Sequence, residues 1–442
     1  MRIHPLLPAL ATAVLLALPG SAWAADAVPG EVVVGYESGA TSLHTRIERA
    51  TGTSTEQRLP GDAKTLDIRD GESVRKTIAE LRRHDEVRYA HPNWRVHASD
   101  FLPDDPGRGA PGDWTKLQWN FTGSASVNAP AAWDLARQAG APGGKGVIVA
   151  VIDSGVAYES RGSFRRAPDL GRTSFVPGYD WVSRDRHPDD EESHGTHVAG
   201  IIAQQTNNGV GLTGLAYGVK IMPLRVLDRH GFGDFASIAS AIRFAANHRA
   251  KVVNMSVEGD AGLRAADIPE VISAMVYAQK RGVVLVAASG NEGDGSVAYP
   301  ARAPQVIAVG GTTADACLAD YSNYGRGLDI VAPGGGADAA LFDNARDRAS
   351  CNPDIRARDV YQQTFVHNFR TFGLVGQEGT SFAAPHVSAA AALLVASGRI
   401  GHHPSPKAVA ARLEATARDL GVDGYDTRYG WGLLDAAKAL AP

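Results

Sequence analysis

The chain has 442 residues and a formal net charge of −4. Apolar residues make up 44% and charged residues 21%, an ordinary globular balance that excludes a wholly disordered chain. The length allows more than one domain. The weak negative charge provides neither the basic surface that binds nucleic acid nor a polybasic face for anionic lipid, so we expect no nucleic-acid partner.

The N-terminus has the organisation of an export signal. Arg2 gives it a positive start, Leu6 to Leu18 is mostly Leu, Ala and Val, and Ala22-Trp23-Ala24 is a small-x-small cleavage signal. The apolar stretch is short and interrupted by prolines, which disfavours a membrane-spanning helix, and a buried N-terminal helix is the alternative. We predict a signal peptide over residues 1–24 and a secreted mature protein, periplasmic or extracellular, without a membrane span.

Cys317 and Cys351 are the two cysteines of the sequence. An even number of cysteines in an exported chain favours a disulfide, which at this spacing stabilises the fold by about 3–4 kcal/mol in the chain-entropy model. Two unpaired thiols are the alternative. Because compartments outside the cytoplasm are oxidising, we predict that the two cysteines are bonded.

Residues 25–105 have the pattern of a small α+β domain. Glu31–Tyr36 is strand-like, Val74–Arg83 has helical spacing, and Glu86–Ala98 alternates like a second strand. The segment Asp100–Asp113 is rich in Pro, Gly and Asp, which is the composition of a linker. We therefore expect a separate N-terminal domain joined by a linker to the rest of the chain.

Residues 115–442 alternate between strand-like and helix-like segments. Val147–Ile152, Val252–Val257 and Val283–Ala288 are continuous apolar runs, typical of strands buried on both faces of a parallel sheet. Alternation with helices predicts one α/β domain. The stretch Gly334–Glu378 has weak periodicity, and we interpret it as a long loop or insertion. Further strands are expected at Val306–Gly310 and Leu328–Ala332, and helices at Gly195–Gln204, Phe235–Asn247, Ile268–Lys280, Ser381–Ala396, Pro406–Leu420 and Leu433–Leu440.

Two polar residues stand where an α/β sheet can place a site. Asp153 directly follows the strand GVIVAVI, at the carboxyl end where such sheets bind ligands, although it could simply cap the next turn. His194 opens HGTHVAGII and begins a helix, facing out of the core. His194 and His197 could share a helix face and bind a metal. No Glu follows His194, so the HExxH zinc pattern is absent, and we expect His197 to be buried and hydrogen-bonded.

Ser381 and Asn291 add a nucleophile and a hydrogen-bond donor. Ser381 begins the helix of GTSFAAPHVSAAAALL, where helix-start N–H groups favour developing negative charge. Asn291 follows VVLVAAS, where its amide can donate to an oxyanion. An N-cap serine and a loop asparagine are the alternatives. Together the residues fit Ser381 as nucleophile, His194 as general base, Asp153 as its orienting group, and Asn291 with the Ser381 N–H as oxyanion donors.

VIDSGV, HGTHVAG, ASGNEG and GTSFAAPH, in this order, resemble the signature motifs of the subtilisin-like serine proteases. The resemblance covers residues 115–442 and implies a three-layer subtilisin-like α/β domain and a secreted serine endopeptidase that works through an acyl-enzyme. Nothing in the sequence argues against a monomer, and we expect one. Residues 25–105, with VPGEVVVGY and VRYAHPNWRV, are similar to the family's propeptide. This implies a self-processing zymogen that is inhibited by its own propeptide and cleaved between Val96 and Trp114.

The resemblance also implies a polypeptide substrate bound as an extended strand. The family usually has glycine where Glu258 stands, and Glu292 lies at the pocket rim, so we hypothesise a preference for a basic side chain before the scissile bond. Phe382 stands where the family often has an oxidisable Met, which predicts activity that survives mild peroxide. The expected substrate-binding residues are Gly231, Phe232, Gly233, Ser256, Val257, Glu258, Gly259, Ala288, Ser289, Gly290 and Ala298.

A calcium site is implied in the same way. Asp169 and the loop that begins at Asn208 match the family's principal calcium site, with the Asp169 carboxylate, the Asn208 side chain and the carbonyls of Val210 and Leu212 as ligands. The loop differs in length from the usual pattern. We interpret the acidic stretch Asp185–Glu192 as a solvated loop and not as a second site.

Two other functions stay open at the level of the sequence. One is an inactive relative that binds peptides or a partner, since motif matches do not prove geometry. The other is a metallohydrolase built on His194 and His197. The secreted serine endopeptidase is the prediction that all four motifs support.

Overall fold

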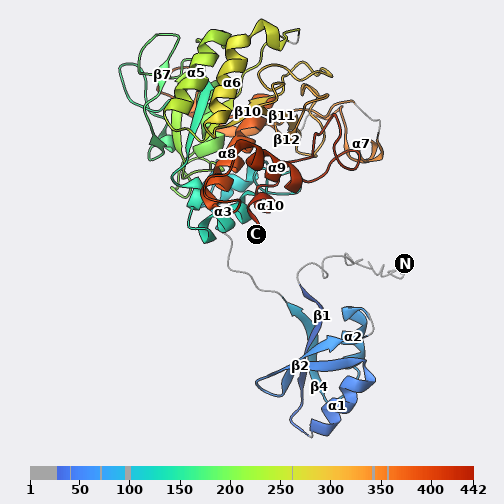
Figure 1. Cartoon of the computed structure of the whole chain (residues 1–442). Coiled ribbons are helices and arrows are strands. Elements are labelled where there is room, and N and C mark those ends of the chain that lie inside the picture. The colour runs from blue at the N-terminus through green and yellow to red at the C-terminus, as the bar shows by residue number, and fades with distance from the viewer. Residues whose placement is uncertain are drawn as a thin grey trace, which may run out of the picture. The chain divides into compact units, whose positions relative to one another are not determined.

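The computed structural model describes residues 27–39, 41–69, 72–94, 101–260, 262–340, 344–355 and 358–442. The predicted signal peptide lies outside these ranges, as does the first part of the segment predicted to be cleaved. The chain divides into two compact units, Met1–Ser99 and Asp100–Pro442 (Figure 1). Each unit has a hydrophobic core of its own, as independently packed domains do.

The first unit is an antiparallel sheet of strand order β2-β3-β1-β4 with helices α1 and α2. Val32 of β1, Leu66 of β3, and Ile78 and Leu81 of α2 meet in its core. Ile78 and Leu81 are three residues apart and so lie on one helix face, as the spacing predicts. The polar strands β2 and β3 have no strong alternation and were not predicted. The elements are β1 (Ala27–Tyr36), α1 (Thr41–Ala50), β2 (Thr53–Leu59), β3 (Ala63–Ile68), α2 (Val74–Leu81) and β4 (Val87–Trp94).

The second unit is built on a parallel sheet of strand order β12-β11-β10-β9-β5-β8-β6, with β7 beside β8. All of these neighbours pair in parallel, which confirms the predicted sheet. β5 lies in the middle, between β9 and β8. The strands are β5 (Ile148–Asp153), β6 (Ser174–Phe175), β7 (Tyr179–Asp180), β8 (Lys220–Arg225), β9 (Val252–Met255), β10 (Val284–Ala288), β11 (Val306–Thr312) and β12 (Ile330–Pro333).

Helices cover both faces of this sheet, which gives the predicted three layers (Figure 1). In β5, Val149 and Val151 belong to the core shared with α3, α4 and α8, whereas Ala150 and Ile152 belong to the core shared with α5 and α6. Side chains alternate across a strand, so a strand buried on both faces is apolar at every position. The helices are α3 (Ala129–Gln138), α4 (His194–Ala203), α5 (Phe235–Asn247), α6 (Pro269–Lys280), α8 (Thr380–Ser397), α9 (Pro406–Thr416) and α10 (Ala436–Leu440), with short 3₁₀ turns at Asp113–Lys116, Pro142–Gly144, Pro168–Leu170 and Ala265–Asp267.

Helix α8 lies inside the second unit. It is the helix of the described chain that is long and apolar enough to cross a membrane by length and composition, and 78% of that window is buried within the unit. It contacts β9, β10, β11 and β12 as well as α4. The apolar composition of α8 is therefore accounted for by its place in the core, which fixes the position of its N-terminal residues.

The stretch Gly334–Glu378 is folded, so its interpretation as a long loop is wrong. It contains α7 (Ala345–Ser350) and an antiparallel hairpin of β13 (Val360–Phe365) and β14 (Phe372–Gln377). The hairpin mixes aromatic, apolar and polar residues, which explains its weak periodicity. The hydroxyl of Thr364 donates to the carbonyl of Ser193 at 2.8 Å, which fastens the hairpin beside the start of α4.

Cys317 and Cys351 form a disulfide, as predicted, with their Cα atoms 5.8 Å apart. Cys351 directly follows α7, so the bond joins the end of this helix to the segment after β11. Cys317 is 1% exposed. The disulfide thereby ties the 334–378 segment to the sheet.

The segment Asp100–Asp113, predicted to be a linker, is packed on the second unit over its described residues from 101 onward. Pro103 is buried and its carbonyl accepts a hydrogen bond from Nε1 of Trp114 at 3.0 Å. Asp105 is fully buried and accepts hydrogen bonds from the N–H groups of Asn207 and Asn208 at 2.8 and 2.9 Å. The linker prediction is therefore wrong here, because composition does not reveal which polar residues have long-range partners.

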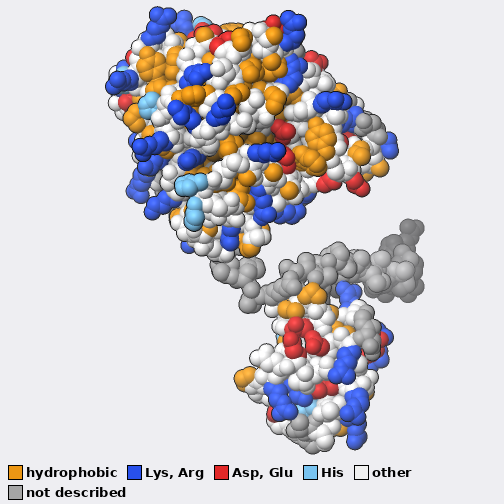
Figure 2. Space-filling view, viewed as in Figure 1, with side chains coloured by type: hydrophobic (Ala, Val, Ile, Leu, Met, Phe, Trp, Pro, Cys, Tyr) orange, Lys and Arg blue, Asp and Glu red, His pale blue; other side chains and the backbone are white. Residues whose placement is uncertain are grey.

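Figure 2 shows Lys and Arg side chains spread over the visible face of the second unit and interspersed with uncharged and apolar groups. Arg225, in contrast, is buried, and it is bonded to Asp180 at 3.1 Å and to Glu191 at 2.7 Å.

Candidate active site

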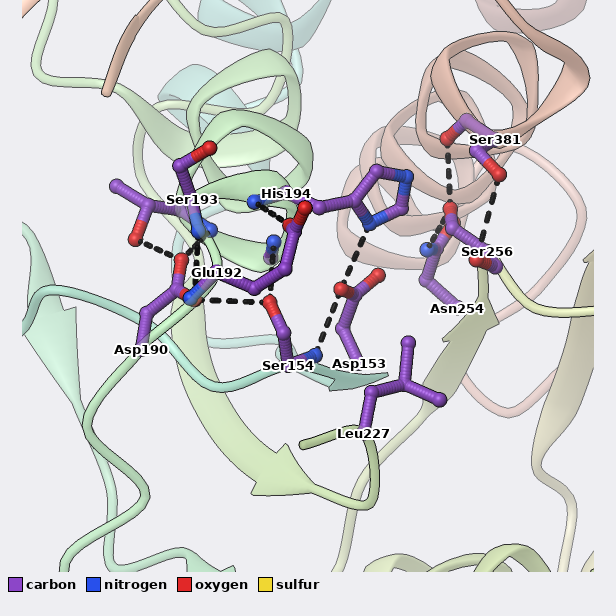
Figure 3. Close-up of polar contacts among 12 residues, drawn as sticks. Asp153, Ser154, Asp190, Glu192, Ser193, His194, Leu227, Asn254, Ser256 and Ser381 are labelled. Atoms are coloured by element: carbon purple, nitrogen blue, oxygen red, sulfur yellow. Dashed lines mark hydrogen bonds and ion pairs between the residues drawn. The ribbon is translucent and has the colours of Figure 1, made fainter. Parts of the chain in front are cut away.

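Neighbouring parallel strands bring the predicted site residues to one edge of the sheet. Asp153 ends β5, Ser256 directly follows β9, and Asn291 stands shortly after β10. The carboxyl ends of adjacent parallel strands lie at the same edge, so these residues approach one another. Helix α8 begins at this edge with Ser381 as its second residue. Figure 3 shows the His194 ring lying between Asp153 and Ser381.

The carboxylate of Asp153 binds the imidazole of His194. Oδ1 of Asp153 lies 2.8 Å from Nδ1 of His194, and the Ser154 N–H donates to the same oxygen at 2.7 Å (Figure 3). Burial disfavours the charged ring, but the charge and hydrogen bond of Asp153, with the charges of Glu192 and Asp190, outweigh it and raise the pKa of His194 to about 9. Because Nδ1 is bonded to Asp153, Nε2 is the ring nitrogen left for a second partner.

Acidic side chains hold the start of α4, which carries His194. The Thr196 N–H and hydroxyl donate to Oδ2 of Asp190 at 2.9 and 2.6 Å, and the His194 N–H donates to Oε2 of Glu192 at 2.8 Å. The first N–H groups of a helix have no acceptor within it, and negative charge is favourable there. Asp190 is 1% exposed. The prediction of a solvated loop over Asp185–Glu192 is therefore wrong, because its last residues cap α4.

Ser381 is tied to the segment after β9. Its hydroxyl donates to the carbonyl of Ser256 at 3.3 Å, and the Ser256 hydroxyl donates to the carbonyl of Ser381 at 2.6 Å (Figure 3). A hydroxyl has one proton, so the bond from Ser381 to Ser256 and a bond from Ser381 to His194 exclude each other. Rotation of Ser381 about its Cα–Cβ bond to another staggered position moves the hydroxyl.

The side-chain amide of Asn291 has a fixed orientation. Its Oδ1 accepts hydrogen bonds from the N–H of Thr380 at 2.8 Å and from the hydroxyl of Thr380 at 3.0 Å. Its Nδ2 donates to Oε1 of Glu258 at 3.3 Å. The preceding Gly290 has φ 115°, and a Cβ there would lie 2.1 Å from Nδ2 of Asn323, so only glycine fits this bend. The backbone bend at Gly290 and the hydrogen bonds from Thr380 together fix the direction of the Nδ2 donor of Asn291. The sequence did not predict this contact between Asn291 and Thr380.

A cavity of about 210 Å³ contains both His194 and Ser381. Predicted substrate-binding residues line it, but Glu192 and Leu227, which also line it, were missed because no motif marks them. Phe232 is 75% exposed and follows Gly231, which lines the cavity. Ala298 is buried, and its N–H donates to the carbonyl of Ser289. The predicted lining residues are Gly231, Ser256, Val257 and Glu258, whereas Ala288, Ser289, Gly290 and Ala298 are buried and not part of the lining.

His197 is a buried, hydrogen-bonded histidine, as expected. Its Nε2 lies 3.1 Å from the carbonyl of Val375, and burial lowers its pKa to about 3, so it is neutral and donates this bond. The ring of Phe382 packs against both histidines, with centroids 5.1 Å from His194 and 4.7 Å from His197. His194 is bonded to Asp153 and His197 to Val375, and among the residues that the structure describes neither histidine belongs to a group of three metal-ligand atoms within 4.8 Å of one another.

The predicted calcium residues come together around their loop. Asp169 is fully buried and accepts hydrogen bonds from Nδ2 of Asn208 and from the N–H of Leu212, both at 2.8 Å. Burial raises the pKa of Asp169 to about 7, and the nearby charge of Asp105 contributes in the same direction. Asp105 was missed in the sequence because it stands in the supposed linker. Two buried carboxylates therefore flank one loop.

The negative charges of Asp169 and Asp105 suit a calcium ion, because calcium binds oxygen ligands that include carboxylates. The side-chain amides of Asn208 and Gln204 present N–H groups to Asp169, so calcium ligation requires that these amides turn their oxygens inward. Leu212 likewise offers its N–H, and the N–H of Val210 donates to Oδ1 of Asn208 at 2.8 Å. The carboxylates fit the ion, and the side-chain amides of Asn208 and Gln204 need to turn before their oxygens can bind it.

Two further groups contain three ligand atoms within 4.8 Å of one another. Glu31, Glu56 and Asp67 lie on the sheet of the first unit and are partly or fully exposed. Cys317, Cys351 and Asp338 form the second group, but its two sulfur atoms are bonded to each other. The first group therefore offers carboxylates to a cation, whereas thiolate ligation by the second would require reduction.

A parallel sheet covered on both faces, with an Asp–His pair and a helix-start serine at one cavity, defines the class of serine hydrolases. Residues 144–432 match the Subtilase family, and residues 18–93 match the Fervidolysin N-terminal prodomain. The chain therefore belongs to the subtilase family: it is a subtilisin-like serine protease with an N-terminal prodomain.

Several known proteins are similar over most of the chain. The Thermophilic serine proteinase of Bacillus sp. (strain AK1) is 34% identical, over 84% of this chain and 79% of that protein. Thermitase of Thermoactinomyces vulgaris is 32% identical, over 72% of this chain and 95% of thermitase. A solved structure of a protease from Pseudoalteromonas arctica PAMC 21717 is 29% identical with a TM-score of 0.60, and covers 77% of this chain and 99% of that one.

Proposed function

We propose that this protease is a secreted endopeptidase in which Ser381, His194 and Asp153 form a catalytic triad. The observation that carries the proposal is the 2.8 Å contact of His194 with Asp153 at the cavity that also contains Ser381. In this scheme the Ser381 hydroxyl turns from Ser256 to Nε2 of His194. Asp153 keeps Nδ1 protonated, so Nε2 is the basic nitrogen.

The reaction then follows from the positions of the groups. Nε2 of His194 takes the Ser381 proton while Oγ attacks the peptide carbonyl, and the Asn291 Nδ2 and the Ser381 N–H stabilise the oxyanion. His194 passes the proton to the departing amine, which leaves an acyl-enzyme. A water molecule, deprotonated by His194, releases the acid and restores Ser381.

The prodomain allows the proposed catalytic role of Ser381 to be tested on the protein's own chain. We propose that residues 25–105 act as an inhibitory propeptide, that residues 115–442 form the mature peptidase, and that Ser381 cleaves between Val96 and Trp114. The measurement is the intact mass of the exported protein, for wild type beside Ser381→Ala. After the signal is removed, a further loss of about 70–90 residues, the length from residue 25 to the proposed cleavage, is expected in the wild type alone. Equal processing of both proteins would show that another protease makes the cut.

The same proposal includes export, a polypeptide substrate and calcium. The signal-like N-terminus and the disulfide support an oxidising compartment outside the cytoplasm. Asp169 would hold the ion through its carboxylate and Asn208 through its amide oxygen after the amide turns, with the carbonyls of Val210 and Leu212 as the other predicted ligands. Asp105 would add a second negative charge beside the loop. Calcium there would neutralise two buried charges and fasten the loop. We expect the mature enzyme to be a monomer, which its sedimentation checks.

A further inference from the structure

Glu258 lies against the amide that the proposed mechanism uses as an oxyanion donor. It lines the cavity with His194 and Ser381, and its Oε1 accepts the hydrogen bond from Nδ2 of Asn291 at 3.3 Å. Its Oε2 is 3.0 Å from the point that a Cβ on Gly290 would occupy. The carboxylate therefore rests on the backbone bend before Asn291 and binds one of the two N–H protons of the donor amide.

The amide cannot avoid this contact by flipping. Oδ1 of Asn291 accepts the hydrogen bond of the Thr380 N–H at 2.8 Å, and because an N–H can only donate, turning the amide over would set two donors against each other. Nδ2 is therefore the atom directed at Glu258, which lines the cavity. In this conformation its acceptor is a carboxylate, where a reacting peptide would place its oxyanion.

Negative charge is crowded around this point. Burial and the neighbouring charge of Glu292 raise the pKa of Glu258. Glu292 itself is anchored by the side-chain amide of Asn323, which donates to it at 2.5 Å. An oxyanion formed beside Glu258 would add a further negative charge and compete for the same donor. A cation placed near Glu258 and Glu292 would relieve both effects.

We propose that Glu258 links the charge of the substrate side chain before the scissile bond to the oxyanion donor Asn291. A guanidinium or ammonium group on the substrate draws the Glu258 carboxylate away from Asn291, and the donor becomes available. An uncharged side chain leaves Glu258 on Asn291 and slows the acylation step. Glu258 is thus a specificity-determining residue, and this inference rests on the proposed function.

The test uses the processed enzyme and peptides that differ only before the scissile bond, where they carry arginine or its uncharged isostere citrulline. For the wild type we expect kcat with arginine to exceed kcat with citrulline by up to about 10²–10³-fold, the loss measured when a subtilisin lacks one oxyanion donor. In Glu258→Gly the citrulline kcat should rise towards the arginine value of the wild type. Glu258→Gln, which keeps the size of the side chain and removes its charge, should move in the same direction.

Two control variants separate this coupling from simple charge attraction. Glu292→Gln removes a carboxylate that is bound by Asn323 and not by Asn291, so it should raise KM for arginine without raising the citrulline kcat towards the arginine value in the way that the Glu258 variants do. In an Asn291→Ala background, Glu258→Gly should no longer increase the citrulline kcat, because the donor on which Glu258 acts is missing.

Each outcome has one meaning. A wild-type preference that lies only in KM, or an unchanged citrulline kcat in both Glu258 variants, would overturn the coupling. A gain on citrulline that persists without Asn291 would overturn it as well. A wild type that cleaves neither peptide, like Ser381→Ala, would overturn the proposed function and this inference with it.

Discussion

Nδ1 of His194, at the start of α4, lies 2.8 Å from Oδ1 of Asp153, at the end of β5. The contact joins two segments that are 41 residues apart in the chain. It places a buried carboxylate behind an imidazole that is 23% exposed at the cavity. The pair therefore controls the charge of the ring that the proposed mechanism uses as a base.

The first prediction concerns pH. The pKa of His194 is raised to about 9, so its neutral, basic form increases about tenfold per pH unit below that value and levels off above it. We expect kcat/KM to rise with pH up to about 9. Glu192→Gln removes one of the charges that raise this pKa but keeps an acceptor for the His194 N–H, so it should shift the profile to lower pH.

Glu191→Gln is the matched control for this shift. Glu191 is the neighbouring carboxylate in the sequence, but it pairs with Arg225 at 2.7 Å and is not among the causes of the His194 shift. Its profile should coincide with that of the wild type. A Glu192→Gln profile that also coincides with the wild type would contradict the electrostatic account.

The second prediction concerns oxidation. Phe382 packs against His194, and Met222, Met255 and Met275 are each at most 1% exposed, so peroxide has little access to a thioether near the site. We expect activity to persist after mild peroxide treatment. Phe382→Met should introduce an inactivation that accompanies a gain of one oxygen in intact mass. Rapid loss of activity in the wild type would refute the prediction.

The third prediction concerns the disulfide. Replacing Cys317 and Cys351 with Ser removes a cross-link over 34 residues, which should lower the free energy of unfolding by about 3–4 kcal/mol. Urea unfolding in the Ser381→Ala background measures this without self-digestion. Reduction of the parent protein should reproduce the loss. An unchanged denaturation midpoint would show that the 334–378 segment is held by its other contacts.

The fourth prediction concerns calcium. If an ion binds beside Asp169, Ser381→Ala protein with calcium at about 100 times its Kd should gain about 2.7 kcal/mol in unfolding free energy over chelated protein. Asp105→Asn removes one flanking charge and should reduce this gain. Elemental analysis of the dialysed protein provides the independent check. Equal melting temperatures with and without calcium, together with no calcium in the protein, would eliminate the site.

The sequence alone predicted most of the second unit because its signals are local. The apolar run of β5 and the spacing within α5 appear in the structure close to the predicted bounds. The hairpin of β13 and β14 escaped prediction since its residues do not alternate cleanly. The supposed linker was misread because Asp105 finds its partners about a hundred residues away, in the loop of Asn207 and Asn208.

The sequence by itself determined the family, the alternation of strands and helices, and the identities of Asp153, His194, Ser381 and Asn291 as candidates. The candidate residues follow from short motifs at the ends of strands and helices, where the backbone geometry determines which chemical role a side chain can take. Only the tertiary structure decided that Asp190 and Glu192 hold α4 and that Glu258 binds the amide of Asn291. Hydrogen bonds between distant segments depend on which elements pack together, and no local pattern encodes those distances.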